Sequence, residues 1–304
     1  MTDTVIESIR EIVGKDAVLI NEPMSKHTTF KIGGEADILI EPDGTDCLLD
    51  VLKVLKEHNV QFFVMGNGSN LLVADRGIRG AVIKISNSMS AVNVDGEYID
   101  AGCGIKLSRL SGIAQNASLT GLEFASGIPG TLGGALFMNA GAYGGEMKDI
   151  VECVTYLDIK SGEIKTISGD ECGFGYRHSL FSKIDAVIIS ARLKLASGDA
   201  VEIRKAMNEL ALRRNEKQPV DKPSAGSTFK RPEGHFAGTM IQDCGLKGYK
   251  IGGAEVSEKH AGFIINAGGA TAKDVRDLIA YVQDTVEEKF SVRLEPEVRF
   301  VGEF

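Results

Sequence analysis

Residues Gly127 to Gly144 read GIPGTLGGALFMNAGAYG, a segment with repeated glycines and no charged side chain. So many glycines weaken a helix interior, and the spacing therefore predicts an irregular loop. A solvated linker would not carry the apolar residues that separate these glycines. Backbone N–H groups with no side chain in front of them can approach a flat or anionic group closely. The segment is therefore expected to bind a ligand through its backbone.

A second glycine-rich loop, GNGSNLLV, runs from Gly66 to Val73. Two such loops in one chain favour a large, phosphate-bearing cofactor, although two tight structural turns are the simpler alternative. The loop departs from the dinucleotide fingerprint GxGxxG, because Leu71 stands at the third glycine position, and the chain has no GK[ST] ending of a P-loop. Polar side chains that could donate to phosphate oxygens are Asn67, Ser69 and Asn70. The residues alone predict a dinucleotide, with a flavin as one candidate.

The composition argues against several classes of protein and of binding site. The chain has 304 residues and a net charge of −8, which argues against nonspecific nucleic-acid binding. Its five cysteines show no CxxC pair, and its five histidines are scattered, so we expect free thiols in a reducing compartment and no metal site. The acidic N-terminus lacks the features of a signal peptide, and no apolar run is long enough to cross a bilayer. A cytoplasmic protein without membrane attachment is expected.

Several elements must position these loops. Apolar spacing predicts helices over 4–13, from Thr45 through Val54 or beyond, and over 107–117, 200–217 and 272–290. Expected N-caps are Thr45, Asp199 and Thr271. Strands are expected at 18–20, 36–40, 62–65, 81–85, 91–94, 98–101, 151–157, 164–167, 186–195, 263–265 and 297–301. The order of these elements describes an α/β unit ending near 85, an α+β unit, and a third unit after the prolines at 219 and 223.

Six motifs that recur in order resemble the UDP-N-acetylenolpyruvoylglucosamine reductase family. They are HTTFKIGG (27–34), GNGSNLLV (66–73), GLEFASGIPGTLGGALFMNAGAYGGE (121–146), YRHSLF (176–181), AGSTFKRP (225–232) and LEPEVRFVG (294–302). The resemblance covers nearly the whole chain, and the joint match is specific. No sizeable insertion separates Tyr176 from Pro219, so the shorter form of the family, without an extra substrate-covering loop, is expected.

The resemblance implies an α+β protein with a vanillyl-alcohol-oxidase-type (PCMH-type) FAD-binding domain and a C-terminal α+β substrate-binding domain. Residues 1–85 and 86–218 would form the two FAD-binding subdomains, and 219–304 the substrate domain, with a last strand near 297–301 that either stays there or returns to the FAD domain. The implied reaction is NADPH-dependent reduction, through FAD, of UDP-N-acetylglucosamine enolpyruvate to UDP-N-acetylmuramate in peptidoglycan precursor synthesis. A monomer is expected, because nothing in the sequence demands an assembly.

The family motifs also assign candidate residues. Catalytic candidates are Arg177, Ser227 and Glu297. Cofactor candidates are Gly66, Asn67, Gly68, Ser69, Asn70, Leu71, Gly127, Ile128, Pro129, Gly130, Gly133, Gly134, Asn139, Ala140, Gly141, Arg213 and Arg214. Substrate candidates are Tyr176, Lys217, Arg231 and His260.

The implied chemistry explains the catalytic set. Hydride addition to an enol ether builds negative charge next to a carboxylate, and the guanidinium of Arg177 can stabilise that charge. The second carbon needs a proton, for which Ser227 is the donor that the family match selects. Glu297 is the matching acidic residue, while Glu295, two positions earlier, competes with it on spacing alone.

Two other functions fit parts of the sequence. A flavoprotein oxidase or dehydrogenase acting on another alcohol or sugar would share the FAD domain but would have a different C-terminal domain. A nucleotide-binding regulatory module without enzymatic activity would be colourless when purified.

Overall fold

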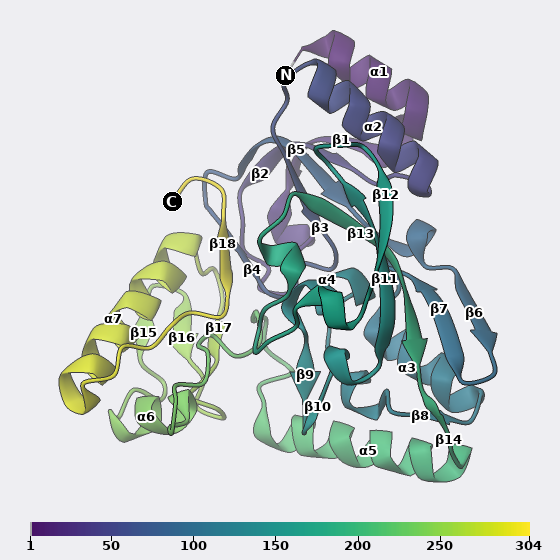
Figure 1. Ribbon diagram of the computed structural model, residues 1–304. Coiled ribbons are helices and arrows are strands. Elements are labelled where there is room, and N and C mark those ends of the chain that lie inside the picture. Colours follow the sequence, from purple (N-terminus) through teal and green to yellow (C-terminus); the bar gives the residue numbers. More distant parts are fainter. Residues whose placement is uncertain (1) are drawn as a thin grey trace. The chain divides into compact units, whose positions relative to one another are not determined.

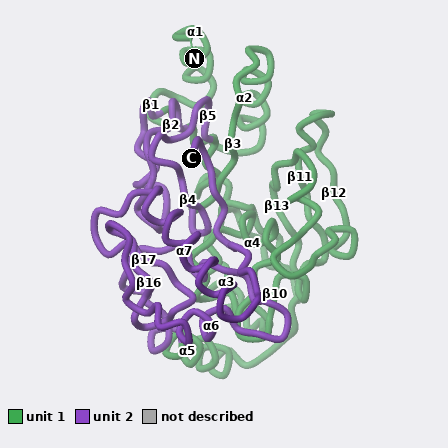
Figure 2. Tube along the Cα trace, turned by 90° about the vertical axis from the view of Figure 1, so that its left-hand side faces the viewer, with its two compact units in different colours: residues 1–18, 40–67, 83–213 green, residues 19–39, 68–82, 214–304 purple. Residues whose placement is uncertain are grey.

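The computed structural model describes residues 2–304 of the chain. They form two compact units, each assembled from separate stretches of sequence (Figure 1, Figure 2). Unit 1 contains the residues up to 18, 40–67 and 83–213, and unit 2 contains 19–39, 68–82 and 214–304. The expected subdomain boundaries at 85/86 and 218/219 stay a prediction, because compactness alone does not define which part binds which ligand.

Two helices of unit 1, α1 (Asp3–Val13) and α2 (Thr45–Glu57), lie side by side (Figure 1). Each buries a stripe of apolar residues at helical spacing, among them Ile9 and Leu48. Both helices were expected from that spacing. The expected N-cap of α2 is wrong, because Gly44 occupies the cap position and Thr45 is the first helical residue. The strand β3 (Phe62–Met65) was also expected.

A five-stranded antiparallel sheet forms the centre of unit 1, in the order β12-β11-β13-β7-β6. Its strands are β6 (Val92–Asp95), β7 (Tyr98–Gly102), β11 (Val151–Asp158), β12 (Ile164–Ser168) and β13 (Ala186–Lys194). The central strand β13 buries Val187, Ala191 and Leu193, which explains its nearly continuous apolar sequence. The helix α3 (Leu107–Asn116) and the short pair β8 (Leu119–Thr120) and β14 (Ala196–Ser197) belong to the same unit.

The glycine-rich segment contains a helix, α4 (Leu132–Met138), which contradicts the expected irregular loop. Gly133 and Gly134 occupy the first turn, while Leu132 and Leu136 are fully buried. Burial of the apolar residues therefore outweighs the conformational entropy that the glycines lose. After α4 the chain forms a small antiparallel pair, β9 (Gly141–Ala142) and β10 (Gly145–Glu146).

The long helix α5 (Ala200–Lys217) begins as expected at an aspartate cap. The Asp199 carboxylate accepts hydrogen bonds from the N–H groups of Val201 and Glu202 at 2.8 and 3.1 Å. Gln115 of α3 donates to the Ala200 carbonyl at 3.1 Å and accepts from Arg204. These polar contacts hold the start of a helix that buries only Ile203 completely.

In unit 2, the strands β1 (Val18–Pro23), β2 (Glu35–Ile40) and β5 (Ile78–Lys84) are neighbours in that order. A parallel pair joins β4 (Leu71–Val73) to β18 (Arg299–Val301), with Leu71 opposite Arg299. The expected last strand therefore begins two residues later than predicted. Short 3-10 helices connect the elements of both units, at Lys15–Ala17, Met24–Lys26, Asn87–Met89, Glu123–Ala125, Met147–Asp149, Asp170–Cys172 and Leu180–Ser182.

The remainder of unit 2 combines a three-stranded antiparallel sheet with two helices. The strands β15 (Lys250–Ile251), β16 (Ala254–Val256) and β17 (Ile264–Asn266) share one core with α6 (Ala237–Asp243) and α7 (Ala272–Phe290). Every fourth or third residue of α7 is buried in that core, from Val275 to Val286. The helix α6 was not expected, because its seven residues are too short to show a periodic pattern.

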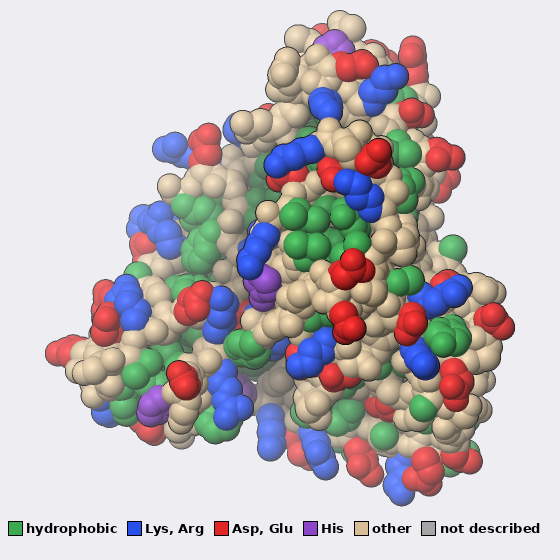
Figure 3. Space-filling view, in the orientation of Figure 1, with side chains coloured by type: hydrophobic (Ala, Val, Ile, Leu, Met, Phe, Trp, Pro, Cys, Tyr) green, Lys and Arg blue, Asp and Glu red, His purple; other side chains and the backbone are tan. Residues whose placement is uncertain are grey.

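The surface mixes charges of both signs. Acidic and basic side chains are interspersed over the face drawn in Figure 3. Among residues 2–304, no helix is both long and apolar enough to cross a membrane.

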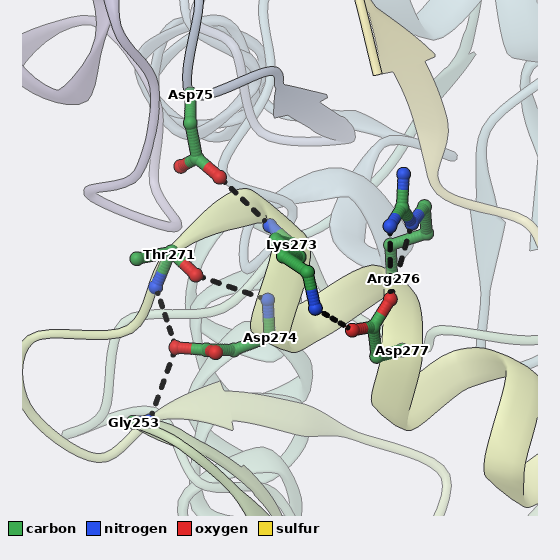
Figure 4. Close-up of polar contacts among 7 residues, drawn as sticks. All are labelled: Asp75, Gly253, Thr271, Lys273, Asp274, Arg276 and Asp277. Atoms are coloured by element: carbon green, nitrogen blue, oxygen red, sulfur yellow. Dashed lines mark hydrogen bonds and ion pairs between the residues drawn. The ribbon is translucent and has the colours of Figure 1, made fainter.

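The first turn of α7 is capped from two directions (Figure 4). Thr271 and Asp274 form a reciprocal capping box, in which each side chain accepts the other's backbone N–H at 3.0 Å. The Asp75 carboxylate, from the loop after β4, accepts from the N–H groups of Ala272 and Lys273 at 2.7 and 3.0 Å. These bonds satisfy N–H groups that have no partner within the helix and place negative charge at its positive end.

We expect Asp75→Ala to lower the free energy of unfolding by about 1 kcal/mol, the usual effect of losing a helix cap and its charge. Urea unfolding followed by circular dichroism measures this. Asp221→Ala, which removes an exposed carboxylate of the same unit, is the control and should change the free energy little. Equal stability of the two variants would contradict the capping role.

Candidate active site

The two glycine-rich segments meet in unit 1 at Gly66 and Asn67. A Cβ atom on Gly66 would lie 2.2 Å from the Thr131 hydroxyl, so only glycine fits there. The side-chain amide of Asn67 donates to the Pro129 carbonyl at 2.6 Å. One of its two amide hydrogens is therefore engaged by the protein. The two segments expected to hold one cofactor are thus adjacent.

Three glycines of the Gly127–Gly144 segment have backbone N–H groups without a backbone acceptor. Within the described part of unit 1, no backbone carbonyl accepts the N–H of Gly127, Gly130 or Gly134. A Cβ on Gly133 would touch Cys103 at 3.1 Å, so this glycine is needed for packing. A Cβ on Gly134 would meet only the Thr131 hydroxyl, at 3.7 Å, so its outer side is open. Free N–H groups beside an open backbone surface fit the diphosphate and ring of a dinucleotide.

Arg177 lies at the tip of a two-residue turn. Gly175 and His178 exchange both backbone hydrogen bonds, at 2.9 and 3.2 Å, which leaves Tyr176 and Arg177 between them. Arg177 has a φ of +54°, the left-handed region that residues other than glycine and asparagine seldom adopt. The Arg177 guanidinium carbon lies 5.2 Å from the centroid of the Tyr176 ring, and that ring is 54% exposed. Such a strained backbone at a side chain of functional type is typical of active sites.

The Asn139 side chain is buried and engaged by protein groups on all sides. Its amide nitrogen donates to the Glu146 carboxylate at 2.6 Å and to the Gly175 carbonyl at 3.1 Å, while its oxygen accepts from the Lys148 N–H at 2.9 Å. Asn139 is only 1% exposed. Both amide hydrogens already have protein acceptors, so the expected contact of Asn139 with the cofactor, which stays a prediction, would be made through its backbone. Its backbone and that of Ala140 and Gly141 remain cofactor candidates.

His178, next to Arg177, was not singled out from the sequence. Its Nδ1 lies 3.3 Å from the Gly173 carbonyl, which favours the tautomer with the proton on Nδ1. Its Nε2 is buried and has no hydrogen-bond partner among the described residues. Buried polar atoms are normally satisfied, so this atom marks a place where a bound group could donate a hydrogen bond. The YRHS motif contained this residue, but only the structure reveals its burial.

In unit 2, Ser227 belongs to an extended segment that runs between two others. The next residue, Thr228, is 3% exposed and hydrogen-bonded on both sides: its N–H donates to the Gly262 carbonyl and its carbonyl accepts from the Glu297 N–H, both at 2.8 Å. The Thr228 hydroxyl also accepts from the Ile264 N–H at 3.0 Å. Ser227 and Glu297, expected partners in catalysis, therefore lie on neighbouring segments. Thr228 was not identified from the sequence.

Four further hydrogen bonds, made by Asn70 and Thr29, tie the Gly66–Val73 loop to these segments. The Asn70 amide donates to the Glu297 carbonyl at 3.2 Å, and the Asn70 carbonyl accepts from the Arg299 N–H at 2.9 Å. Thr29 of the HTTFKIGG motif donates its N–H to the Gly68 carbonyl at 3.4 Å and its hydroxyl to the Ser224 carbonyl at 2.7 Å. One asparagine and one threonine thus connect the loop with the chain on either side of the candidate catalytic groups.

The two competing carboxylates differ in their surroundings. Glu295 is 70% exposed at its side chain and forms an ion pair with Lys230 at 2.5 Å. Glu297 is half-buried. A half-buried carboxyl is less exposed to screening by water than a largely exposed one, so these environments favour Glu297.

The remaining candidates occupy exposed or half-exposed positions, except Leu71, which is buried. Lys217 and Arg213 are exposed near the end of α5, and Arg214 between them is half-buried. The Arg231 guanidinium carbon lies 4.0 Å from the centroid of the Phe236 ring. Ser69 and Leu71 follow Gly68 in unit 2, Leu71 as the first residue of β4, and Ile128 donates its N–H to Ala125 in unit 1. No group of three or more histidine, cysteine or acidic side chains in the described chain is arranged for a metal ion.

His260 is held in a structural position. Its Nδ1 accepts the Gly262 N–H at 3.1 Å, and its ring lies edge-on to Phe263 with the centroids 5.1 Å apart. Burial lowers the pKa of His260 below its ordinary value. The Gly262 carbonyl in turn accepts from Thr228, so the neutral imidazole supports the turn beneath the Ser227 segment.

Comparison with known proteins identifies the family. Residues 218–301 match the family described as UDP-N-acetylenolpyruvoylglucosamine reductase, C-terminal domain, and residues 36–168 match the FAD binding domain. A UDP-N-acetylenolpyruvoylglucosamine reductase from Caldanaerobacter subterraneus subsp. tengcongensis is 52% identical over 303 residues, which cover 100% of both chains. One from Alkaliphilus oremlandii is 51% identical, over 98% of this chain and 97% of that one. The chain belongs to this reductase family.

Solved structures agree with that assignment. The crystal structure of the reductase from Thermus caldophilus superposes with a TM-score of 0.80 at 34% identity, covering 94% of this chain and 98% of that chain. A glucose dehydrogenase, Phl p 4.0202, matches 64% of this chain and 44% of its own, with a TM-score of 0.51 at 17% identity, which shows a shared fold alone. The expected vanillyl-alcohol-oxidase-type FAD domain with a C-terminal α+β domain is confirmed. The chain is an FAD-dependent oxidoreductase, and the match of its C-terminal domain argues against an oxidase acting on another sugar.

We expect Gly134→Ala to lower FAD affinity without harming the fold. The new methyl group has room in the protein and raises helix propensity by about 1 kcal/mol, but it would stand on the open side that we expect to face the cofactor. Flavin titration and thermal unfolding of the flavin-free protein measure the two effects. Gly112→Ala in α3, where a Cβ likewise has room because it meets nothing within 4 Å, is the matched control. An unchanged FAD affinity in Gly134→Ala would remove this glycine from the cofactor site.

We also expect stability to decrease in mild acid because of His260. Its pKa in the folded protein is below the ordinary 6.5, so the unfolded chain takes up the proton first. The stabilisation is complete above about pH 6.5 and is lost as the pH falls toward the folded pKa. Denaturant unfolding across this range should show a smaller loss for His260→Gln, which keeps an acceptor without titrating. His58→Gln, at an exposed histidine, should retain the wild-type loss.

Proposed function

We propose that this chain carries out NADPH-dependent reduction of the enolpyruvyl group of UDP-N-acetylglucosamine enolpyruvate, giving UDP-N-acetylmuramate, with Arg177, Ser227 and Glu297 as its catalytic residues. FAD, when bound, would supply the hydride-transfer chemistry that connects NADPH with the terminal carbon of the enol ether. The observation that carries the proposal is the strained turn of Arg177, tied to the end of the helix that starts in the glycine-rich segment.

Arg177 would bind the substrate carboxylate. When hydride adds to the terminal carbon, negative charge develops on the adjacent carbon and spreads onto that carboxylate. The planar guanidinium can donate two parallel hydrogen bonds to a carboxylate and keeps its charge throughout. Because the turn fixes the backbone of Arg177, its side chain would require little reorganisation as the charge develops.

Ser227 would donate the proton that completes the reduction at the second carbon. A hydroxyl is a weak acid, and it can act here only when held against a strong developing base. Its segment is held on both sides by hydrogen bonds of Thr228, and Gly226 before it has a φ of +80°, a conformation natural to glycine. This rigid backbone supports a fixed position for the hydroxyl.

Glu297 would act beside Ser227, either orienting its neighbours or restoring the proton to the hydroxyl. Support comes from the backbone bond that places Glu297 next to Thr228. Lys217 and Arg231 would bind the nucleotide diphosphate, Tyr176 would flank the substrate pocket, and Arg213 or Arg214 would contact the FAD pyrophosphate.

We further propose that the protein works as a cytoplasmic monomer that binds neither nucleic acid nor a membrane. All five cysteines are unpaired as thiols, as expected in a reducing compartment. Size-exclusion chromatography with light scattering tests the monomer.

We expect Ser227→Ala to leave reduction of the flavin by NADPH nearly unchanged and to slow its reoxidation by the enolpyruvyl sugar nucleotide by about 100-fold or more, the usual range for a lost general acid. Stopped-flow absorbance of the flavin separates the two half-reactions. Glu297→Gln should show the same selectivity, whereas Glu295→Gln should not.

Ser224→Ala, in the same segment, is the control for local disturbance. If Ser227→Ala slowed both half-reactions equally, the serine would not be the proton donor. If the wild-type flavin were not reoxidised by the sugar nucleotide, the proposed reaction itself would be wrong.

A further inference from the structure

The left-handed conformation of Arg177 has to be maintained by its surroundings. For an arginine this conformation costs on the order of 1 kcal/mol, and a free turn would relax from it. The two backbone bonds between Gly175 and His178 close the turn, but they do not attach it to the rest of the unit. Contacts from outside the turn must therefore fix the direction in which Arg177 projects.

We propose that Asn139 and Ser179 are positioning residues for Arg177, holding the two ends of its turn against the C-terminal end of α4. The inference rests on the proposed role of Arg177, and it explains which contacts set the direction of the Arg177 side chain. The proposal requires neither side chain to contact the substrate or the cofactor.

Asn139 holds the first end of the turn. The Gly175 carbonyl accepts from the Asn139 amide at 3.1 Å in addition to the His178 N–H at 3.2 Å. Asn139 is itself left-handed, with a φ of +43°, as is common for an asparagine that ends a helix. The Glu146 carboxylate and the Lys148 N–H fix the Asn139 amide from both sides.

Ser179 holds the second end. Its hydroxyl donates to the Phe137 carbonyl at 2.7 Å, and the residue is completely buried. Phe137 lies in the last turn of α4, where helix carbonyls lack partners within the helix. The serine hydroxyl, completely buried itself, therefore ties the end of the turn to the end of α4.

The two anchors give α4 a second role. Its first turn contains Gly134, whose N–H is unused, and its last turn holds the arginine turn. A single helix of seven residues thus sets the distance between the backbone that faces the cofactor and the side chain that binds the substrate carboxylate. A displacement of about 1 Å in such a constellation can cost on the order of 100-fold in rate.

The test uses the full-length, FAD-loaded protein and compares both half-reactions. Asn139→Gly retains the left-handed backbone and removes only the amide. We expect its flavin content and its reduction by NADPH to change less than about twofold, and reoxidation by the enolpyruvyl sugar nucleotide to fall about 10-fold or more. Ser179→Ala should show the same selectivity. The control, Ser111→Ala, removes an equally buried hydroxyl that donates to the Leu122 carbonyl at 2.9 Å, and should leave both half-reactions unchanged.

A double-mutant cycle separates positioning from general loss of stability. In an Arg177→Ala background, Asn139→Gly should cause no further loss of the second half-reaction, because there is no guanidinium left to aim. Additive losses, equal losses in both half-reactions, or a selective loss of FAD from Asn139→Gly would overturn the inference. If Asn139→Gly cannot be obtained folded, the same cycle with Ser179→Ala decides it.

Failure of the proposed function gives a different result. If Arg177→Ala alone leaves reoxidation by the sugar nucleotide intact, the assignment of Arg177 is wrong. If Arg177→Ala impairs it while both anchor variants do not, only the positioning role is wrong.

Discussion

Close approach of backbone to backbone is the constraint on which this structure depends. In unit 2, a Cβ on Gly34 would lie 2.1 Å from the Asp75 carbonyl, and one on Gly77 would lie 1.8 Å from the Glu35 carbonyl. Side chains are excluded at these crossings, so the chain can bring loops together through main-chain hydrogen bonds alone. The same principle applies at Gly66 in unit 1, where the two candidate cofactor segments touch. Candidate catalytic side chains, such as Arg177, then lie on turns whose positions these backbone contacts fix.

The framework also explains why asparagine, serine and threonine recur in the motifs. Asn67, Asn70, Thr29 and Ser179 each donate a side-chain hydrogen to a main-chain carbonyl elsewhere in the same unit. Short polar side chains can close such a link at little cost in side-chain entropy. These polar side chains, whose types suggest ligand binding, therefore stabilise the fold through hydrogen bonds within the protein. Any ligand contacts of these motifs are expected from the backbone.

Elements with a strong local signal could be predicted from the sequence. The helices α1, α5 and α7 follow their apolar spacing or their caps, and the helix starts after Asp199 and Thr271 rest on hydrogen bonds that a local motif encodes. The helix α4 could not be predicted, because glycine propensity argued against it and only tertiary burial of Leu132 and Leu136 supports it. The cap of α2 was misassigned because Gly44 and Thr45 are both acceptable by type. For the site, the motifs named Arg177, Ser227 and Glu297. They could not reveal that Asn139 is fully engaged or that Thr228 is the central anchor, since those facts depend on long-range contacts.

The carboxylate at the start of α7 has a consequence for recognition of the sugar nucleotide. Phosphate groups commonly bind at helix N-termini, and α7 is the longest helix of unit 2. Asp75 already occupies that place with a negative charge of its own. This helix end is therefore unfavourable for the diphosphate of the substrate, and its proposed ligands, Lys217 and Arg231, are exposed cationic side chains instead. Capture of that kind is weakened by ionic strength far more than capture by a fixed dipole in a sheltered pocket, so the substrate affinity of this enzyme should depend strongly on salt.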